Sequence, residues 1–448
     1  LCGHAWSVWV ATEKSGCAVT DRKRIMRKLL FIFITLPLAV YGQTLQECQQ
    51  AAERNYPLIR QYGLTEKTTQ LTVENIGKAW LPQVTATAQA TYQSDVTAWP
   101  DQMQAVYQQM GLNMKGLRKD QYRVGIDVSQ TVYDGGAIRS QKDIARMQGE
   151  VEQAQTEVTM YQVRRRVNEM YFALLLADEQ IRLNADLEKT LAGSEEKLSA
   201  MFHRGTASES DYLSVRAERL KVVQQGEDIK AQRKSLAMML STFCGIEVRN
   251  PSKPAAITRT TTSTLTSRPE LKVIEARLRL ADVQEESLDA ALKPRLGVFA
   301  QGYYGYPGYN LFEDMMHHRW SWNGMVGARL SWNIGALYTR KNDKAKIQLM
   351  RDMAENSREV FMYNNTLEQI QHNDNTDRYR RMMQADDEIV SLRTSVRQAA
   401  ESKLSHGIID VNDLLKEINA ENSAQTQRTI HEIQMLKEMY ELSFTINQ

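Results

Sequence analysis

The sequence predicts a mixed, mainly α-helical fold that combines long coiled-coil helices with four transmembrane β-strands per chain. Three observations support this prediction. Two stretches without proline carry helical patterns far longer than a globular helix. Two pairs of segments, each about ten residues long, alternate apolar and polar side chains as strands do. The same order of elements occurs twice, about 200 residues apart, so the chain is predicted to be a duplication.

The composition narrows the class of protein. The 448 residues are 42% hydrophobic and carry a formal net charge of +2. This near-neutral balance gives no reason to expect a nucleic-acid partner. No stretch of the sequence approaches the roughly 20 apolar residues of a membrane-spanning helix. Any membrane insertion is therefore expected to use the strands.

The start of the chain has the pattern of a secretory signal peptide. The basic residues 26–28 precede a short apolar run, and Val40 and Gly42 supply the small side chains that fit cleavage before Gln43. A buried N-terminal helix is the alternative. We expect residues 1–25 to be an upstream extension, 26–42 the signal peptide and 43–448 the mature chain.

The mature chain would keep two of the four cysteines, Cys48 and Cys244. Two cysteines make no disulfide framework. Residues 45–47, which precede Cys48, are bulky or polar and argue against a lipid anchor at that position.

The first half is predicted to start with a helix and continue with a strand hairpin. The helical pattern from Leu45 to Trp80 ends at Pro82, because proline ends a helix and favours an extended residue before it. Alternation then predicts a strand from Val84 to Tyr92. After a polar loop over residues 95–120, a second strand begins at Tyr122, which gives a membrane hairpin over 83–133.

The second strand leads through a glycine pair into a long helix. Prolines are absent between residues 100 and 251, so the helix from Ala137 to about Ala200 would have about 64 residues and a length of ~96 Å. A glycine turn interrupts the helical pattern near residue 205. A strict heptad follows and predicts left-handed coiled-coil packing; its apolar positions are Val215, Val222, Ile229, Leu236 and Phe243.

Residues 245–268 are rich in Pro, Thr and Ser and are predicted to link two repeats, 43–244 and 269–448. The second repeat has the same order: a helix that ends at Pro294, a membrane hairpin over 295–333, a second proline-free helix and a glycine turn. Each glycine turn is followed by an aspartate at the same spacing. A repeat of about 200 residues is far longer than a solenoid period.

The two hairpins have the dimensions of membrane strands. A tilted membrane strand needs about ten residues, and its backbone groups must all be paired, so the sheet must close. Four strands cannot close, because the smallest membrane barrels have about eight. Three chains would share a barrel of about 12 strands with room for a lumen. The alternative is a soluble protein with two hairpins.

Two sets of side chains follow from this barrel. Aromatic residues at the strand ends predict an interfacial girdle: Tyr92, Tyr122, Tyr304, Trp322 and Trp332. Polar faces of the strands would line the lumen, with Thr85, Arg123, Asp127 and Arg329.

With this duplicated order of helix, proline, hairpin, glycine turn, long helix, Gly-x5-Asp and helix, residues 43–448 resemble the TolC family of outer-membrane channel proteins. The resemblance implies a homotrimer whose 12-stranded barrel lies in the lipid of a Gram-negative outer membrane and continues as an α-barrel across the periplasm. It also implies a passive exit duct that works with a periplasmic adaptor (membrane fusion) protein. The inner-membrane pump would be of the resistance-nodulation-division or ABC type.

The resemblance assigns two kinds of site. The tips that meet the adaptor correspond to His203, Arg204, Gly205 and Thr206, and to Ser405, His406, Gly407 and Ile408. At the periplasmic aperture Asp413 matches an acidic residue of the family, Lys416 stands where a second acid often occurs, and Asp211 resembles a residue of the polar latch between helices. A ring of Asp413 would favour cations, and Lys416 would partly neutralise it. The alternative is ordinary solvated charges at a helix start.

Export of drugs and amphiphiles leads, with ATP-driven peptide or protein secretion as the alternative; heavy-metal efflux and a periplasmic coiled-coil scaffold are weaker. A trimeric autotransporter would carry its strands in one block rather than in two distant hairpins. An HExxH motif and a phosphate-binding glycine loop are both absent from the sequence, so no enzyme, cofactor or metal is predicted. Glu313, Asp314, His317 and His318 lie together in the predicted external loop, where a metal site is the alternative and a solvated loop is favoured.

Overall fold

The computed structural model describes residues 43–112, 116–257 and 266–447. The predicted upstream extension and signal peptide lie outside the described residues, as does part of the predicted linker. In these ranges, none of the helices has both the length and the apolar composition needed to cross a bilayer.

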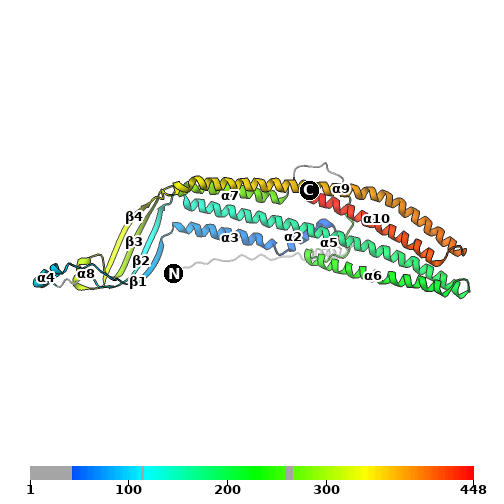
Figure 1. Ribbon diagram of the computed structural model, residues 1–448, viewed down its shortest axis with the longest axis horizontal. Helices are drawn as coiled ribbons and strands as arrows, with labels where there is room; N and C mark the ends of the chain where they lie inside the picture. The colour runs from blue at the N-terminus through cyan, green and yellow to red at the C-terminus, as the bar shows by residue number, and fades with distance from the viewer. Residues whose placement is uncertain (1–42, 113–115, 258–265, 448) are drawn as a thin grey trace, which may run out of the picture. The chain divides into compact units, whose positions relative to one another are not determined.

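The first half folds as a helical segment, a strand hairpin and a helical hairpin (Figure 1). Its elements are α2 (Leu45–Asn55), α3 (Ile59–Gly77), η2 (Lys78–Trp80), β1 (Gln83–Tyr92), α4 (Asp101–Gln109), β2 (Asp120–Tyr133), α5 (Ala137–His203) and α6 (Glu209–Cys244).

Two details of the predicted first half are wrong. The helical pattern from Leu45 to Trp80 is not one helix, because it breaks at Tyr56, whose ψ of 129° is extended. Pro57 follows, and the residue before a proline avoids helical geometry. The polar loop before β2 also contains a short helix, α4, which begins directly after Pro100.

The second half repeats this order with α7 (Pro269–Ala291), β3 (Arg295–Tyr306), α8 (Leu311–His317), β4 (Ser321–Ser331), α9 (Ala336–Ser405) and α10 (Val411–Ile446). The two long proline-free helices are confirmed: α5 has 67 residues and α9 has 70. The predicted combination of long helices with four strands is confirmed as well.

The four strands form one antiparallel sheet in the order β1-β2-β3-β4. Val124 pairs with Ala88 on one side and with Tyr304 on the other, and Tyr304 pairs with Trp322. Residues paired in register share a face of a sheet. The apolar sides of all four strands therefore lie on the same face, as the alternation predicted.

A buried aspartate shapes the turn from β2 into α5. Both Gly135 and Gly136 have positive φ, at 71° and 93°, which favours glycine. Asp134 accepts hydrogen bonds from the Gly136 and Ile138 backbone N–H groups at 2.8 and 2.6 Å and so caps the start of α5. The aligned Gly335 has a φ of −60°, so the second turn does not need its glycine in this way.

Two apolar clusters hold the helices together. The larger cluster joins α2, α5, α6 and α10 around the buried Tyr171 and Phe172. The smaller joins the two helical hairpins close to their turns, where Leu198 of α5 packs with Val411 and Leu414 of α10.

Candidate functional site

The two helical turns at the ends of the long hairpins have the same geometry. In the first turn, Gly205 has a φ of 77° and Thr206 N–H donates to the Met201 carbonyl at 2.9 Å. In the second, Gly407 has a φ of 70° and Ile408 N–H donates to the Lys403 carbonyl at 2.9 Å. Both are Schellman motifs, which end a helix at a left-handed glycine. The predicted equivalence of the two tips is therefore structural as well as sequential.

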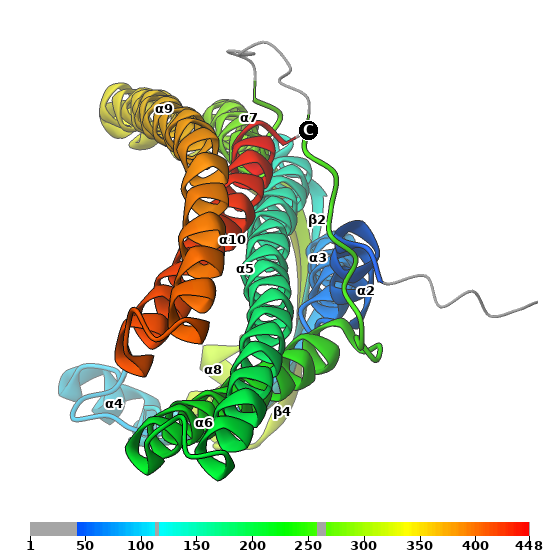
Figure 2. The ribbon, with the colours of Figure 1, turned by 90° about the vertical axis from the view of Figure 1, so that its right-hand side faces the viewer.

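The tip residues are exposed, and the hairpins beneath them are joined. All eight predicted tip residues, 203–206 and 405–408, are exposed in the single chain. Below them the two hairpins share the smaller apolar cluster, and Asn419 Nδ2 donates to Glu218 Oε1 across the hairpins at 3.0 Å. Figure 2 shows the two turns from the end of the hairpins. The two exposed turns therefore lie at the ends of hairpins that are joined by one apolar cluster.

The predicted aperture residues have local partners on their own helices. Asp413 Oδ1 lies 3.0 Å from Lys416 Nζ, one helical turn away, and both side chains are exposed. This hydrogen bond and the charge of Asp413 raise the pKa of Lys416. Asp413 N–H in turn donates to the Asp410 carboxylate at 2.8 Å, so Asp410 caps α10.

Asp211 is the matching residue in the first repeat, and it forms a capping box with Ser208. Ser208 N–H donates to Asp211 Oδ2 at 3.2 Å, and Asp211 N–H donates to Ser208 Oγ at 3.1 Å. The carboxylate therefore serves the start of α6 within this chain. Its part in a latch stays a prediction.

The four predicted lumen residues share the second face of the sheet. Asp127 pairs in register with Thr85 and accepts a hydrogen bond from Thr87 Oγ1 at 3.4 Å. The Arg123 guanidinium lies over the Tyr303 ring at 4.2 Å, and that of Arg329 over the Phe299 ring at 5.1 Å. Polar groups are thus gathered on the face opposite the apolar one.

The predicted aromatic residues lie at both ends of the strands. Around the loop end, Tyr304 is 5.1 Å from Trp322 and 5.3 Å from Trp320, which stacks on Tyr122 at 5.9 Å between ring centroids. Tyr92 ends β1 on the same side. Trp332 follows β4 at the helix end, where its Nε1 donates to the Leu292 carbonyl at 2.9 Å.

The acidic side chains of the loop between β3 and β4 interact with other groups of the protein. Asp314 is buried and accepts a hydrogen bond from Gly308 N–H at 2.6 Å. Glu313 pairs with Arg319 at 2.8 Å, and His318 Nε2 lies 2.7 Å from the Gly116 carbonyl oxygen. In the described ranges these side chains hold the loop and do not converge on a metal site.

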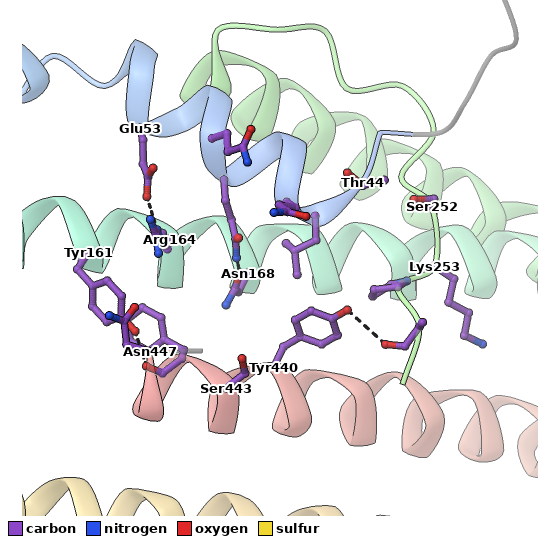
Figure 3. A pocket seen from close by; sticks show the side chains of 17 residues that line it. Thr44, Glu53, Tyr161, Arg164, Asn168, Ser252, Lys253, Tyr440, Ser443 and Asn447 are labelled. Carbon is purple, nitrogen blue, oxygen red and sulfur yellow. Dashed lines mark hydrogen bonds and ion pairs between the residues drawn. The ribbon is translucent and has the colours of Figure 1, made fainter. Parts of the chain in front are cut away.

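A polar recess of about 570 Å³ lies between α2, α5, α10 and residues 252–255 (Figure 3). Its charged lining residues already have partners: Arg164 pairs with Glu53, and Lys253 with Glu432 at 2.6 Å. Gln49 also donates to Asn168 at 2.6 Å. We assign the recess no ligand.

The sequence patterns missed two features. Cys48 and Cys244, distant in the sequence, meet in the larger apolar cluster. The contact between α9 and α10 also contains polar pairs: the buried His431 has its Nδ1 2.6 Å from Asp386, and the partly buried His372 has its Nδ1 2.6 Å from Glu438. Neither feature has a signal at fixed spacing, since its partners meet only in the folded chain.

Comparisons with known proteins agree with this architecture. Residues 48–245 match a family model described as outer membrane efflux protein. No curated relative matches the chain.

Solved structures match over nearly the whole chain. The outer-membrane channel OprN is 16% identical, with a TM-score of 0.64 over 90% of this chain and 89% of its own. CusC is 11% identical, with a TM-score of 0.65 over 91% and 92%. VceC from Vibrio cholerae is 12% identical, with a TM-score of 0.62 over 90% and 94%. At these identities the likeness shows a shared fold.

Proposed function

We propose that this chain belongs to the TolC-like outer membrane efflux protein family, whose model matches residues 48–245, and that it is a passive exit duct for small molecules such as drugs and amphiphiles. Proteins of this family lie in the outer membrane of Gram-negative bacteria and extend into the periplasm. They work with a periplasmic adaptor and an inner-membrane pump, and they are not enzymes. The mature unit proposed here is 43–448, built from the two repeats.

The observation that carries the proposal is a sheet with one apolar face and two open edges. In the described sheet, β1 pairs only with β2, and β4 pairs only with β3. Backbone groups left unpaired in lipid are costly, so these edges need partner strands. The strand order makes β4 of one copy antiparallel to β1 of the next. Three copies would close a barrel of about 12 strands, with Arg123 and Asp127 facing the lumen.

An apolar stripe on α9 supports the same assembly. Val360, Tyr363, Leu367 and Ile370 recur at helical spacing and are between 48% and 67% exposed in the single chain. Within one chain, α9 packs on α10 and α7. A contiguous apolar stripe of this kind marks a protein interface.

The complementary surface lies on other helices. Exposed apolar residues are present on α3 and α6, which pack against α5 rather than α9: Leu64, Leu71, Leu213 and Leu220. Two different surfaces that meet head to tail generate a ring. We infer that the α9 stripe of one copy is covered by the α3 and α6 faces of the next.

The substrate depends on the pump. A passive duct takes its cargo from its partners, so identifying the pump decides between small-molecule export and ATP-driven peptide or protein secretion. A photo-crosslinking residue at Thr206 or Ile408, in living cells, is expected to capture a periplasmic adaptor. Mass spectrometry of the product and of the proteins that co-purify with it identifies the pump.

A matched control carries the same crosslinker at Lys221, which is exposed on α6 away from the turn. It should capture no adaptor. A proton-driven pump supports small-molecule efflux, and an ATP-driven transporter supports secretion. Capture of neither, in cells that express both kinds of system, contradicts the duct and favours a periplasmic scaffold.

A further inference from the structure

The first described residues form a strap along the end of α6. We call residues 43–55 the N-terminal strap. Gln43 N–H donates to the Asn250 carbonyl at 3.1 Å, and Ser252 N–H donates to the Gln43 carbonyl at 3.1 Å. At the other end, Asn55 Nδ2 donates to the Thr242 carbonyl at 3.2 Å. The strap is therefore fixed at both ends to residues 242–252.

Two cysteines meet midway along this contact. Cys48, on the strap, is 0% exposed, and Cys244, the last residue of α6, is 1% exposed. The Cys244 thiol lies 3.4 Å from the Cys48 carbonyl oxygen. Both belong to the apolar cluster that includes Leu240 and Val248. Both are free thiols in this structure.

Their surroundings favour pairing with each other over other cysteine chemistry. In the described ranges, no further histidine, cysteine or acidic residue joins them in a possible metal site.

The compartment supplies the oxidising conditions. The helices of this family lie in the periplasm, where disulfides form and persist. We propose that Cys48 and Cys244 are joined by a disulfide in the mature protein, which ties the N-terminal strap covalently to the end of α6. This proposal rests on the periplasmic location and is independent of the exported substrate and of the pump.

The reaction is a thiol–disulfide exchange with a disulfide-bearing oxidant protein. One of the two cysteines, as its thiolate, attacks one sulfur of the oxidant's disulfide, and the other sulfur of that disulfide leaves as a thiolate. The thiolate of the second cysteine then attacks the first cysteine's sulfur in the mixed disulfide, and the oxidant's remaining sulfur leaves as a thiolate. Two thiols of this chain are oxidised, the oxidant's disulfide is reduced to two thiols, and two protons pass to it.

The burial of both thiols sets the timing. A protein oxidant cannot reach two side chains that are at most 1% exposed. The exchange must therefore occur while the chain folds, after the end of α6 has reached the periplasm and before the apolar cluster closes.

Peptide mapping of the native protein tests the proposal. Outer membranes are dissolved in denaturant with a thiol-alkylating reagent, and the purified protein is digested with trypsin without reductant. Cys48 and Cys244 fall on separate peptides, 43–54 and 235–249. We expect one linked species, with the summed mass of the two peptides less two hydrogens, that separates on reduction. Recovery of both peptides mainly in alkylated form would overturn the proposal.

Two variants serve as controls. Cys48→Ser should leave Cys244 alkylated in every molecule, because its partner is gone. In Cys48→Ala/Cys244→Ala, added reductant should no longer lower the melting temperature, whereas it should lower that of the wild type. An equal effect of reductant on both proteins counts against the bond. None of these results depends on transport.

Discussion

The two long helical hairpins share their length and turn geometry but differ in what holds them together. Between α5 and α6 the fully buried residues near the turn are apolar, Leu191, Val215 and Val222, and an ion pair of Glu195 with Arg219 lies at the partly exposed edge. Between α9 and α10 it contains buried ionisable groups, among them Asp386, Glu421 and His431.

The difference has a physical consequence. Buried apolar contacts between helices are strong but tolerate small shifts along the helices, whereas paired buried polar groups specify one register. The first hairpin is therefore expected to keep its shape over a wide range of conditions. The second is expected to respond to the loss of single partners and, through Glu438 and Glu441 of α10, to pH.

The largest expected loss of stability comes from a substitution in the buried apolar contact between α5 and α6. Leu191→Ala removes a side chain that is 0% exposed and leaves a cavity, so it should lower the free energy of unfolding by about 3–5 kcal/mol. Thermal unfolding followed by circular dichroism measures the change. Arg182→Ala, an exposed change on the same helix, is the control, with an expected change within about 0.5 kcal/mol. Equal losses in the two variants would contradict the assigned packing.

Breaking a buried polar pair between α9 and α10 should reduce stability somewhat less. His431→Ala leaves the buried Asp386 carboxylate without its partner at 2.6 Å and should lower the free energy of unfolding by about 2 kcal/mol. Replacing both residues with leucine should restore most of that stability. A double variant as unstable as the single one would show that the pair is not the cause. Thermal unfolding of the three proteins decides.

A substitution of Glu441 is expected to increase stability rather than reduce it. This residue of α10 is 4% exposed, and neither carboxylate oxygen accepts a hydrogen bond in the described structure. Burial raises the pKa of Glu441, although the charge of Arg165 opposes the shift. The folded state then binds more protons than the unfolded state, so this residue's contribution to stability falls as pH rises from the ordinary glutamate pKa through the raised one.

Glu441→Gln should remove this loss and stabilise the protein by about 1 kcal/mol at neutral pH. The melting temperature, measured from acidic to neutral pH, should differ between variant and wild type mainly at the upper end. The neighbouring Glu438 has the opposite sign: burial would raise its pKa, but the hydrogen bond from His372 lowers it overall. Its stabilisation is present at neutral pH and lost as pH falls. An unchanged profile for Glu441→Gln would exclude it as a titrating group.

The smallest expected effect is on ion selectivity, and it distinguishes the turn at Gly407 from the turn at Gly205. Asp413 has a lysine partner, whereas Asp211 has Ser214 at the position that corresponds to Lys416. We expect Lys416→Ala to raise cation preference, because the Asp413 charge is then unscreened, and Asp413→Ala to lower it. Conductance and reversal potential of the purified protein in a planar bilayer measure this. Unchanged values for both variants would remove these residues from the aperture.

The sequence predicted those features whose signal is periodic. Strict alternation predicted the common apolar face of the sheet, and the absence of proline predicted α5 and α9. The Gly205 and Gly407 turns followed from their shared spacing. Each of these features depends on local geometry and so leaves a regular pattern in the chain.

Other features of the structure depend on contacts between distant residues, or on short local patterns that are not periodic. The contact of Cys48 with Cys244 and that of Asp386 with His431 join positions whose meeting depends on packing. The capping box at Asp211 has the sequence pattern Ser-x-x-Asp, which is a local signal for the start of a helix. The break at Pro57 was also visible in the sequence.

The two open edges of the sheet have a consequence for inheritance. If each ring takes three chains at random, equal expression of normal and defective copies leaves only about one ring in eight entirely normal. A chain with a defect in the aperture would still enter rings, so the defect would be dominant. A chain whose β1 cannot pair would be excluded from rings, so that defect would be recessive. The same protein can therefore show both genetic behaviours, depending on whether a change spares its assembly.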